Sequence, residues 1–378
     1  MFPAFIAIAL LALAGTVVLP AVLDASPAAR VHLAFSVGIM PLILAAFDYF
    51  VPVLTRSGGS SRRARALPWV ALAAGLLAFA HFALPDAQGH ALSAGAFGAM
   101  IAAAASAGWM FTRGSRTVGR PHPCLYWYVA AALCLAAAAA AALAMPMHGN
   151  LYVVLKRVHL HLNTLGFVGL TAVGTLQVLM PTVAGRPDAQ VADRLRRDLP
   201  FAVAGSLLVA AGAAWQSWFA WAGLVAWMVP VTRLAAAWWR LYRREILAWH
   251  GSATLLAGAL AGFAFMLVAP ALQSALHAQM RGLPYVFVLI FLLPLVTGAA
   301  AALLPVLLRP GVQTPWHAAF RDTAGRHAGA RALLFLSGGA AFALGHEEGV
   351  ALSLVALVLT LLQIQLAIAT RKDSGSSK

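Results

Sequence analysis

Charge is scarce in this chain, and negative charge is the scarcest. The 378 residues include 11 Asp and Glu against 26 Lys and Arg, and these four types make up 10% of the sequence. With 62% hydrophobic residues and a mean hydropathy of +0.84, too few polar groups remain to cover a soluble domain. The composition therefore excludes a water-soluble protein and predicts one whose main partner is the lipid bilayer.

Cysteine is nearly absent as well. Cys124 and Cys134 share one apolar segment and lie too far apart along a helix to bridge, which excludes a disulfide framework and a cysteine-based metal motif. We find no phosphate-cradling glycine loop and no nucleophile elbow. The first segment, Met1 to Pro20, lacks a basic leader and a cleavage site, so we expect a retained first span.

Positive charge is abundant, with a formal net charge of +15. Such a charge is typical of nucleic-acid-binding proteins, but here the arginines lie in short loops between apolar runs. That distribution orients helices in a membrane and does not form a recognition surface. We therefore expect no nucleic-acid partner.

Apolar runs of about 20 residues, the length of one membrane span, recur along the chain. We expect an all-α membrane protein of about twelve spans, forming a single polytopic domain over residues 1–378. The expected spans are 2–23, 30–55, 67–84, 90–112, 124–147, 155–181, 198–214, 218–239, 248–269, 282–308, 329–345 and 349–370. The least marked boundary, between the seventh and eighth spans, lies near Trp215–Ser217.

The loops carry charge alternately. If they are assigned to two sides in turn, 21 of the 26 basic residues fall on one side. The other side holds Arg30, Lys156, Arg157 and Arg281, and Arg233 falls inside the eighth span. Because positive loops stay in the cytoplasm, both termini are expected there, in a bacterial inner membrane. Below, the arginine-rich side is called the basic end and the other side the opposite end.

An internal repeat relates three of the spans. In each, a histidine or tyrosine precedes a proline by twenty residues, in the pairs His32 and Pro52, His161 and Pro181, and Tyr285 and Pro305. These are spans two, six and ten, so the period is four spans. A twelve-span chain with that period predicts three four-helix units around a pseudo-threefold axis. The alternative is chance recurrence in an Ala- and Leu-rich chain.

Most histidines fall toward the opposite end. Ionisable groups inside a bilayer are costly and usually face a bundle interior, and imidazole binds metals and haem iron. His159 and His161 are rotated by about 200° on an α-helix, so each could hold a cofactor on its own side. Gly166, seven residues after His159, would remove bulk where a macrocycle lies. The alternatives are a loop-edge histidine and glycines that serve helix contacts.

His32 occupies the repeat position of His161. Two histidines at one depth on different helices can supply both axial ligands of a low-spin haem. The alternative is an interfacial histidine bonded to a backbone carbonyl. His81 and His90, at the end of span three and the start of span four, could form a second metal site, for copper. His250, His277 and His346 are weaker candidates, and we expect His122, His317 and His327 to be solvated loop residues.

Few other charges lie within the spans. Asp48 in span two and Arg233 in span eight could serve a proton path or a buried ion pair, although Arg233 could also snorkel to the interface. Neither belongs to a chain of protonatable groups across the bilayer. A proton pump therefore has little support in the sequence.

The chain resembles the catalytic subunit of haem-copper oxidases and nitric oxide reductases, and their NnrS-type relatives. The resemblance rests on His32, on the phrase His159-Leu-His161-Leu-Asn-Thr-Leu-Gly166, and on the phrase beginning His90-Ala-Leu-Ser-Ala. It implies twelve spans in three arcs, with His159 on a high-spin b-type haem and His161 with His32 on a low-spin haem. The chain departs from the oxidases in carrying the H-x-H on span six and Tyr285, not histidine, on span ten.

The leading hypothesis is thus a haem-binding protein, with copper as a second metal, acting in respiratory or nitric oxide metabolism. As a divergent oxidoreductase it would use a redox partner protein or quinol, and a small gaseous ligand such as NO or O2. Two alternatives stay open. One is a transporter or channel without a cofactor, which twelve spans and internal repeats also fit. The other is a metal-delivery or assembly factor for an oxidase that uses His81 and His90.

Overall fold

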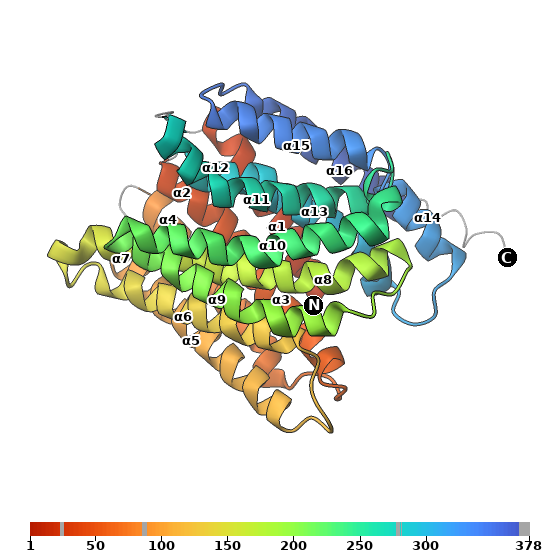
Figure 1. Ribbon diagram of the computed structural model, residues 1–378, viewed down its shortest axis with the longest axis horizontal. Coiled ribbons are helices and arrows are strands. Elements are labelled where there is room, and N and C mark those ends of the chain that lie inside the picture. The colour runs from red at the N-terminus through yellow and green to blue at the C-terminus, as the bar shows by residue number, and fades with distance from the viewer. Residues whose placement is uncertain (23–25, 85–88, 277–279, 281, 370–378) are drawn as a thin grey trace. The chain divides into compact units, whose positions relative to one another are not determined.

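The computed structural model describes residues 1–22, 26–84, 89–276, 280 and 282–369, and in these residues every regular element is a helix (Figure 1). Eleven helices or helix combinations in this part of the chain are long and apolar enough to cross a membrane. Such a set of helices is that of a multi-pass membrane protein. Arg281 and the basic residues of the C-terminal tail lie outside the described residues.

Contacts divide the chain into two compact units. The first comprises Met1–Ala12, Leu23–Val178 and Asp188–Leu234, and the second comprises Leu13–Val22, Leu179–Pro187 and Ala235–Lys378. The elements up to residue 246 are α1 (Phe2–Val22), α2 (Pro27–His32), η1 (Leu33–Ile39), α3 (Met40–Leu54), α4 (Arg62–Ala83), α5 (Gly89–Ser115), α6 (Cys124–Ala144), η2 (Gly149–Leu151), α7 (Tyr152–His161), η3 (Leu162–Gly169), α8 (Leu170–Ala184), α9 (Val191–Ala214) and α10 (Ser217–Ile246).

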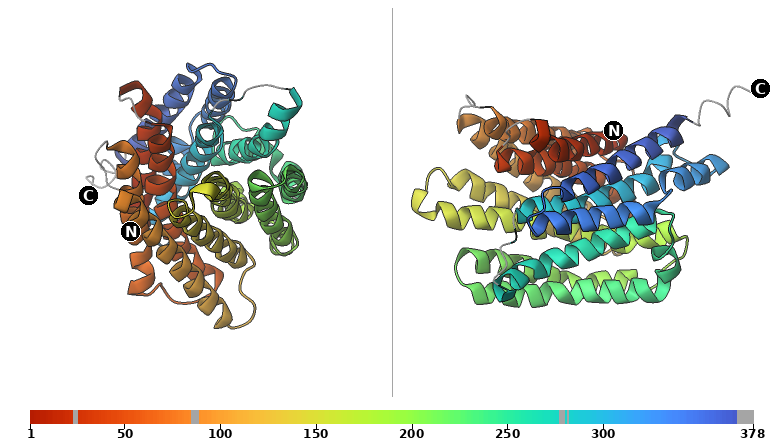
Figure 2. Two further views of the ribbon diagram at one scale, coloured as in Figure 1. Left: turned by 90° about the vertical axis from the view of Figure 1, so that its left-hand side faces the viewer. Right: turned by 90° about the horizontal axis from the view of Figure 1, so that it is seen from above.

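The remaining elements belong to the second unit. They are α11 (Ser252–Leu276), α12 (Leu283–Phe287), η4 (Val288–Leu292), α13 (Leu293–Leu308), α14 (Pro315–Ala324), α15 (Ala328–Ala343) and α16 (Gly349–Ala369). Within the first unit α4, α5 and α6 lie side by side (Figure 2). Within the second, α15 lies against α16, and α11 against α13.

The expected spans agree with these helices. The weakest boundary is confirmed, because α9 ends at Ala214 and α10 begins at Ser217. The expected eleventh span, 329–345, corresponds to α15, which has 16 residues and is shorter than any of the eleven membrane-spanning candidates. Two features were not predicted. The helix of the seventh span, α9, begins at Val191, because its charged first turns extend beyond the apolar run. The short helix α14 is additional and lies in the loop before α15.

Each of the three repeat-related helices changes to π-helical geometry at overlapping repeat positions. The π-helical segment η1 follows His32 directly, η3 follows His161 directly, and η4 begins three residues after Tyr285. Since π-helical turns are rare and are frequent at functional sites, three at overlapping positions are not expected by chance. The repeat seen in the sequence is therefore also a repeat of backbone structure.

Two of these π-helical segments are crossed closely by a neighbouring helix. A side chain on Gly75 of α4 would collide with the Ser36 carbonyl oxygen in η1, and one on Gly262 of α11 would collide with the Ile290 carbonyl oxygen in η4. Only glycine allows a backbone approach of this kind. These two glycines let α4 and α11 lie directly on a π-helical turn.

A proline at the end of the repeat leaves a backbone carbonyl without its helical hydrogen bond. Proline has no N–H, so Pro52 frees the carbonyl of Asp48 four residues earlier. The Ser60 hydroxyl donates to that carbonyl oxygen at 2.9 Å. The loop after α3 is thereby tied back onto the helix that precedes it.

The loop contacts agree with the alternation of charge. At the basic end of the first unit, Arg113 donates to the Gly58 carbonyl at 2.8 Å and the His122 amide donates to the Leu54 carbonyl at 3.0 Å. At the opposite end, Arg157 donates to the Ala213 carbonyl at 2.9 Å. Loops expected on one side therefore contact one another in this unit.

Candidate functional site

His32 and His161, at equivalent repeat positions, make the same local hydrogen bond. His32 Nδ1 donates to the Ala28 carbonyl oxygen at 2.8 Å, and His161 Nδ1 donates to the Arg157 carbonyl oxygen at 2.8 Å, in each case four residues earlier. A carbonyl oxygen only accepts, so the proton of each neutral ring lies on Nδ1. The lone pair is then on Nε2, where a metal would bind.

His159 has the same tautomer but a different anchor. Its Nδ1 donates to the Ala138 carbonyl of α6 at 2.9 Å, so its ring is fixed by a neighbouring helix. Asn163 lies one turn on, with its amide nitrogen 2.8 Å from the His159 carbonyl oxygen and 3.4 Å from Nε2. The amide therefore stands close to the nitrogen that would coordinate a metal.

The rings of α2 and of the α4 end form a cluster. Phe82 lies between two histidines, with ring centroids 4.4 Å from His32 and 4.9 Å from His81. His159 and His81 both lie within electrostatic range of His32. His81 Nδ1 is enclosed and has no hydrogen-bond partner in the part of the chain that the structure describes. An enclosed imidazole nitrogen without a partner fits a ligand to a metal or cofactor.

The structure thus brings His32 close to His159 and His81. His159 and His161 are both in α7, an α-helix, so the expected rotation between them holds. The specific pairing of His32 with His161 on one haem stays a prediction.

Gly166 has a neighbour that the sequence did not predict. A side-chain carbon built there would lie 2.7 Å from Cys134 Cβ and 2.9 Å from its sulfur. The expectation assumed an α-helix from His159 onward, but Gly166 lies in η3, where the wider π-helical turn changes the facing of later residues. Gly166 therefore admits Cys134 of α6, and its expected place beside a haem stays a prediction.

The pairing of His81 with His90 on copper stays a prediction. His90 is exposed near the start of α5, and no hydrogen bond or ring contact joins it to His81 among the described residues. Within the same residues no group of three or more His, Cys, Asp and Glu side chains is placed to hold a metal ion. His81 is the member of the pair whose surroundings fit a ligand.

The basic-end histidines have the reverse tautomer. Backbone N–H groups donate to Nδ1 of His122, His250 and His317, so in the neutral rings the proton is on Nε2. His317, expected to be a solvated loop residue, is in fact 1% exposed, and its Nε2 donates to the Arg309 carbonyl at 2.9 Å. His327 is exposed, as expected, and so is His346. His277 lies outside the described residues.

Of the two intramembrane charges expected from the sequence, Arg233 forms an ion pair. Arg233 forms an ion pair with Asp198 at 2.8 Å, which favours the ion-pair interpretation over snorkelling. Asp198 is fully buried, and its second carboxylate oxygen has no partner among the described residues. Asp48 likewise has one enclosed oxygen without a partner in that part of the chain.

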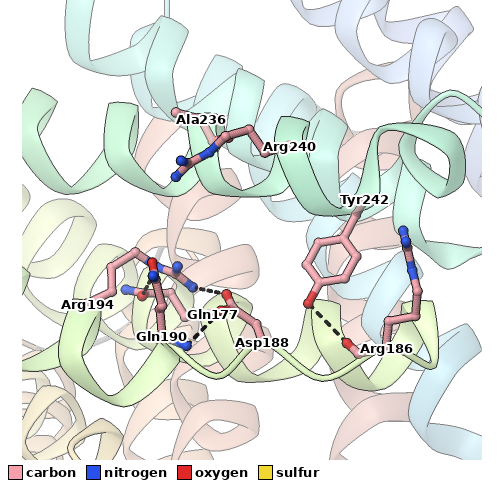
Figure 3. A network of polar contacts seen from close by, with 8 residues as sticks. All are labelled: Gln177, Arg186, Asp188, Gln190, Arg194, Ala236, Arg240 and Tyr242. Atoms are coloured by element: carbon pink, nitrogen blue, oxygen red, sulfur yellow. Dashed lines mark hydrogen bonds and ion pairs between the residues drawn. The ribbon is translucent and has the colours of Figure 1, made fainter.

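Two arginines assigned to loops are buried in helices. Arg194 of α9 donates to Gln177 at 2.8 Å and forms an ion pair with Asp188 at 2.7 Å (Figure 3). Arg331 of α15 is fully buried and donates to Thr360 at 3.0 Å. From the sequence, these arginines are counted with the basic loops because they are charged. Their partners come from other elements, so the sequence does not show that they are buried.

Several residues of the histidine cluster could not be found from spacing. Phe82 and the Ala138 carbonyl belong to other helices, and nothing in the local sequence marks them. Asn163, four residues after His159, was detectable as a neighbour on one helical face.

No protein-family model matches the chain, and no curated protein matches it either. The arrangement of the histidines therefore carries the functional argument.

Proposed function

We propose that this protein is a haem-binding membrane protein of the NnrS and haem-copper oxidase type, acting in respiratory or nitric oxide metabolism. One observation supports this most. Three histidines at one end of the first unit direct Nδ1–H to a backbone carbonyl, which leaves Nε2 as a ligand nitrogen. Metal-bound histidines in proteins typically have this outer hydrogen bond, which fixes the ring and raises its basicity.

His32, His159 and His161 are the proposed ligands of one or two b-type haems. When bound, haem supplies one-electron chemistry and, where an axial position stays open, binding of NO or O2. The protein's contribution is to hold the imidazoles: His32 and His161 through their own helices and His159 through α6. His81, with its enclosed Nδ1, is the proposed ligand for an additional metal such as copper.

The setting of this site is also part of the proposal. The proposed location is a bacterial inner membrane with both termini in the cytoplasm, because arginine-rich loops favour the cytoplasmic side. The opposite end, which carries the proposed haem ligands, would then face the periplasm. There a quinol or a redox partner protein would deliver electrons. The three repeat helices are proposed to surround a pseudo-threefold axis.

The test is a reduced-minus-oxidised optical spectrum of detergent-purified protein made with haem supplied, with pyridine haemochrome quantification. We expect haem in the wild type and loss of at least one haem in His161→Ala. The matched control is His122→Ala, which removes a histidine of the other tautomer and keeps full haem content. Colourless, well-folded wild type would contradict the proposal and favour the transporter alternative. Metal without haem would favour the metal-delivery alternative.

A further inference from the structure

Three arginines at the end of α10 have no acidic partner in the described residues. Arg240, Arg243 and Arg244 are all exposed. Glu245, the adjacent carboxylate, is already paired with Arg186 at 2.7 Å. Arg240 makes one long hydrogen bond, Nε to the Ala236 carbonyl of its own helix at 3.4 Å. Three positive charges are therefore concentrated in five residues without a protein counter-charge.

The exposed face of this helix changes character along its length. After Thr232 and Arg233, the latter paired with Asp198, the exposed residues are Ala235 and Ala236, then Trp239 at 55% exposed, and then the arginines from Arg240. The face is apolar, then aromatic, then basic. The same order describes a bilayer, in which hydrocarbon gives way to the interface where Trp is enriched and then to the headgroups.

Tyr242 fixes the direction of the last turn. It is 1% exposed, and its hydroxyl donates to the Arg186 carbonyl at 3.1 Å (Figure 3). Its backbone, with φ −127° and ψ 16°, leaves helical geometry, so α10 kinks at this residue. The turn that carries Arg243 and Arg244 is thus anchored to the rest of the second unit. The arginines therefore have defined positions and do not belong to a frayed helix end.

The apolar margin continues past the helix. Leu247 is 69% exposed and Trp249 is 52% exposed, directly after the last arginine turn. Exposed leucine and tryptophan side chains on both sides of an arginine cluster would lie among the acyl chains and glycerol groups. The guanidinium groups would then meet the phosphate level.

We propose that Arg240, Arg243 and Arg244, with Trp239 and Trp249, bind the headgroup of an anionic phospholipid. Guanidinium forms paired hydrogen bonds with phosphate oxygens, and clustered arginines next to a membrane span attract anionic lipids. The proposal is independent of haem. It also goes beyond the role of positive loops in orienting helices, because it predicts retention of a particular lipid class by the purified protein.

The experiment measures lipid retained by the protein in dodecyl maltoside after incubation with mixed micelles of equal phosphatidylglycerol and phosphatidylcholine. The variant is R240Q/R243Q/R244Q. The matched control is R63Q/R116Q/R120Q, which removes three exposed arginines at the basic end of the first unit. Melting temperature without added lipid shows that each variant is folded.

We expect the wild type and the control to retain phosphatidylglycerol preferentially. Each arginine near an anionic surface is worth about fivefold in affinity, so the triple variant should bind roughly 100-fold more weakly and lose its preference. Raised salt should weaken retention by the wild type. Equal retention of the two lipids by the wild type would overturn the proposal, as would unchanged preference in the triple variant. Salt-sensitive binding of an acidic peptide without lipid preference would also overturn it, in favour of a protein partner.

Discussion

The histidines whose Nδ1 forms a hydrogen bond fall into two groups with opposite tautomers. At one end of the first unit, Nδ1 of His32, His159 and His161 donates to a carbonyl oxygen. In the basic-end loops, Nδ1 of His122 and His317 accepts a backbone N–H. The same side chain is thus held by a carbonyl oxygen in the first group, for which we propose metal binding, and used as a local backbone cap in the second.

The difference shows why a count of histidines says little about function. The basic-end rings satisfy loop amides, as in the Thr314–His317 capping box of α14. The other rings satisfy carbonyls that lie in or between helices, and Nε2 of His32 and His161 faces no hydrogen-bond partner among the described residues. What a histidine can bind follows from the group that holds its other nitrogen.

The largest expected effect is on haem content. The double variant His32→Ala/His161→Ala should lose haem almost completely, because both proposed repeat-related ligands are gone. The double variant His122→Ala/His317→Ala should retain it. Pyridine haemochrome quantification per folded protein measures both. Equal loss in the two double variants would show that tautomer does not separate ligands from structural histidines.

At the third repeat position a tyrosine stands in place of a histidine. Tyr285 is buried, its ring lies 5.0 Å from that of Phe342, and its hydroxyl donates to the Thr16 carbonyl at 3.4 Å. Tyr285→His should therefore not add a haem, although it places histidine at the repeat position. A gain of haem in this variant, measured in the same way, would mean that position alone determines binding.

The next largest effect is on stability at the π-helical turns. Gly75→Ala should destabilise the protein by about 1–3 kcal/mol or more, because the added carbon meets the Ser36 carbonyl. Gly262→Ala should do the same in the other unit. Gly108→Ala in α5 is the control, since nothing lies within 4 Å of the added carbon. Thermal unfolding in detergent measures all three, and equal melting temperatures would contradict the tight crossing.

Sequence reasoning predicted the helices well because apolar length and loop charge determine them directly. It also found the repeat, because His32 and His161 keep a fixed distance to their prolines. It did not predict the contact of Gly166 with Cys134, since a π-helical turn changes which residues share a face and leaves no sequence signal. It failed at His317 because the burial of that ring depends on a capping box and on Arg309, which only the folded loop brings together.

A smaller effect on stability is expected at His317 itself. His317→Ala removes hydrogen bonds to the Thr314 amide and the Arg309 carbonyl and leaves buried groups unpaired, which costs about 1–3 kcal/mol. The melting temperature should fall while haem per folded protein stays constant. A parallel loss of haem would contradict the assignment of His317 to the group of structural histidines.

The smallest effect is a pH dependence at His122, in the loop before α6. Burial lowers the pKa of His122, and the guanidinium groups of Arg196 and Arg56 lower it further. The folded state then binds fewer protons than the unfolded state, so stability should fall as pH drops below about 6.5, toward the lowered pKa. His122→Gln should flatten this part of the melting-temperature profile. A profile identical to that of the wild type would contradict the assignment.

The most direct test of the two-group account is a long-range proton–nitrogen NMR spectrum of haem-free protein labelled with ¹⁵N-histidine, assigned by single substitutions. We expect neutral rings protonated on Nδ1 for His32, His159 and His161, and on Nε2 for His122 and His317. Added haem should then shift the Nε2 resonances of the first group alone. Nε2 protonation of His32 and His161 would contradict the account, because neither ring would then offer a ligand nitrogen.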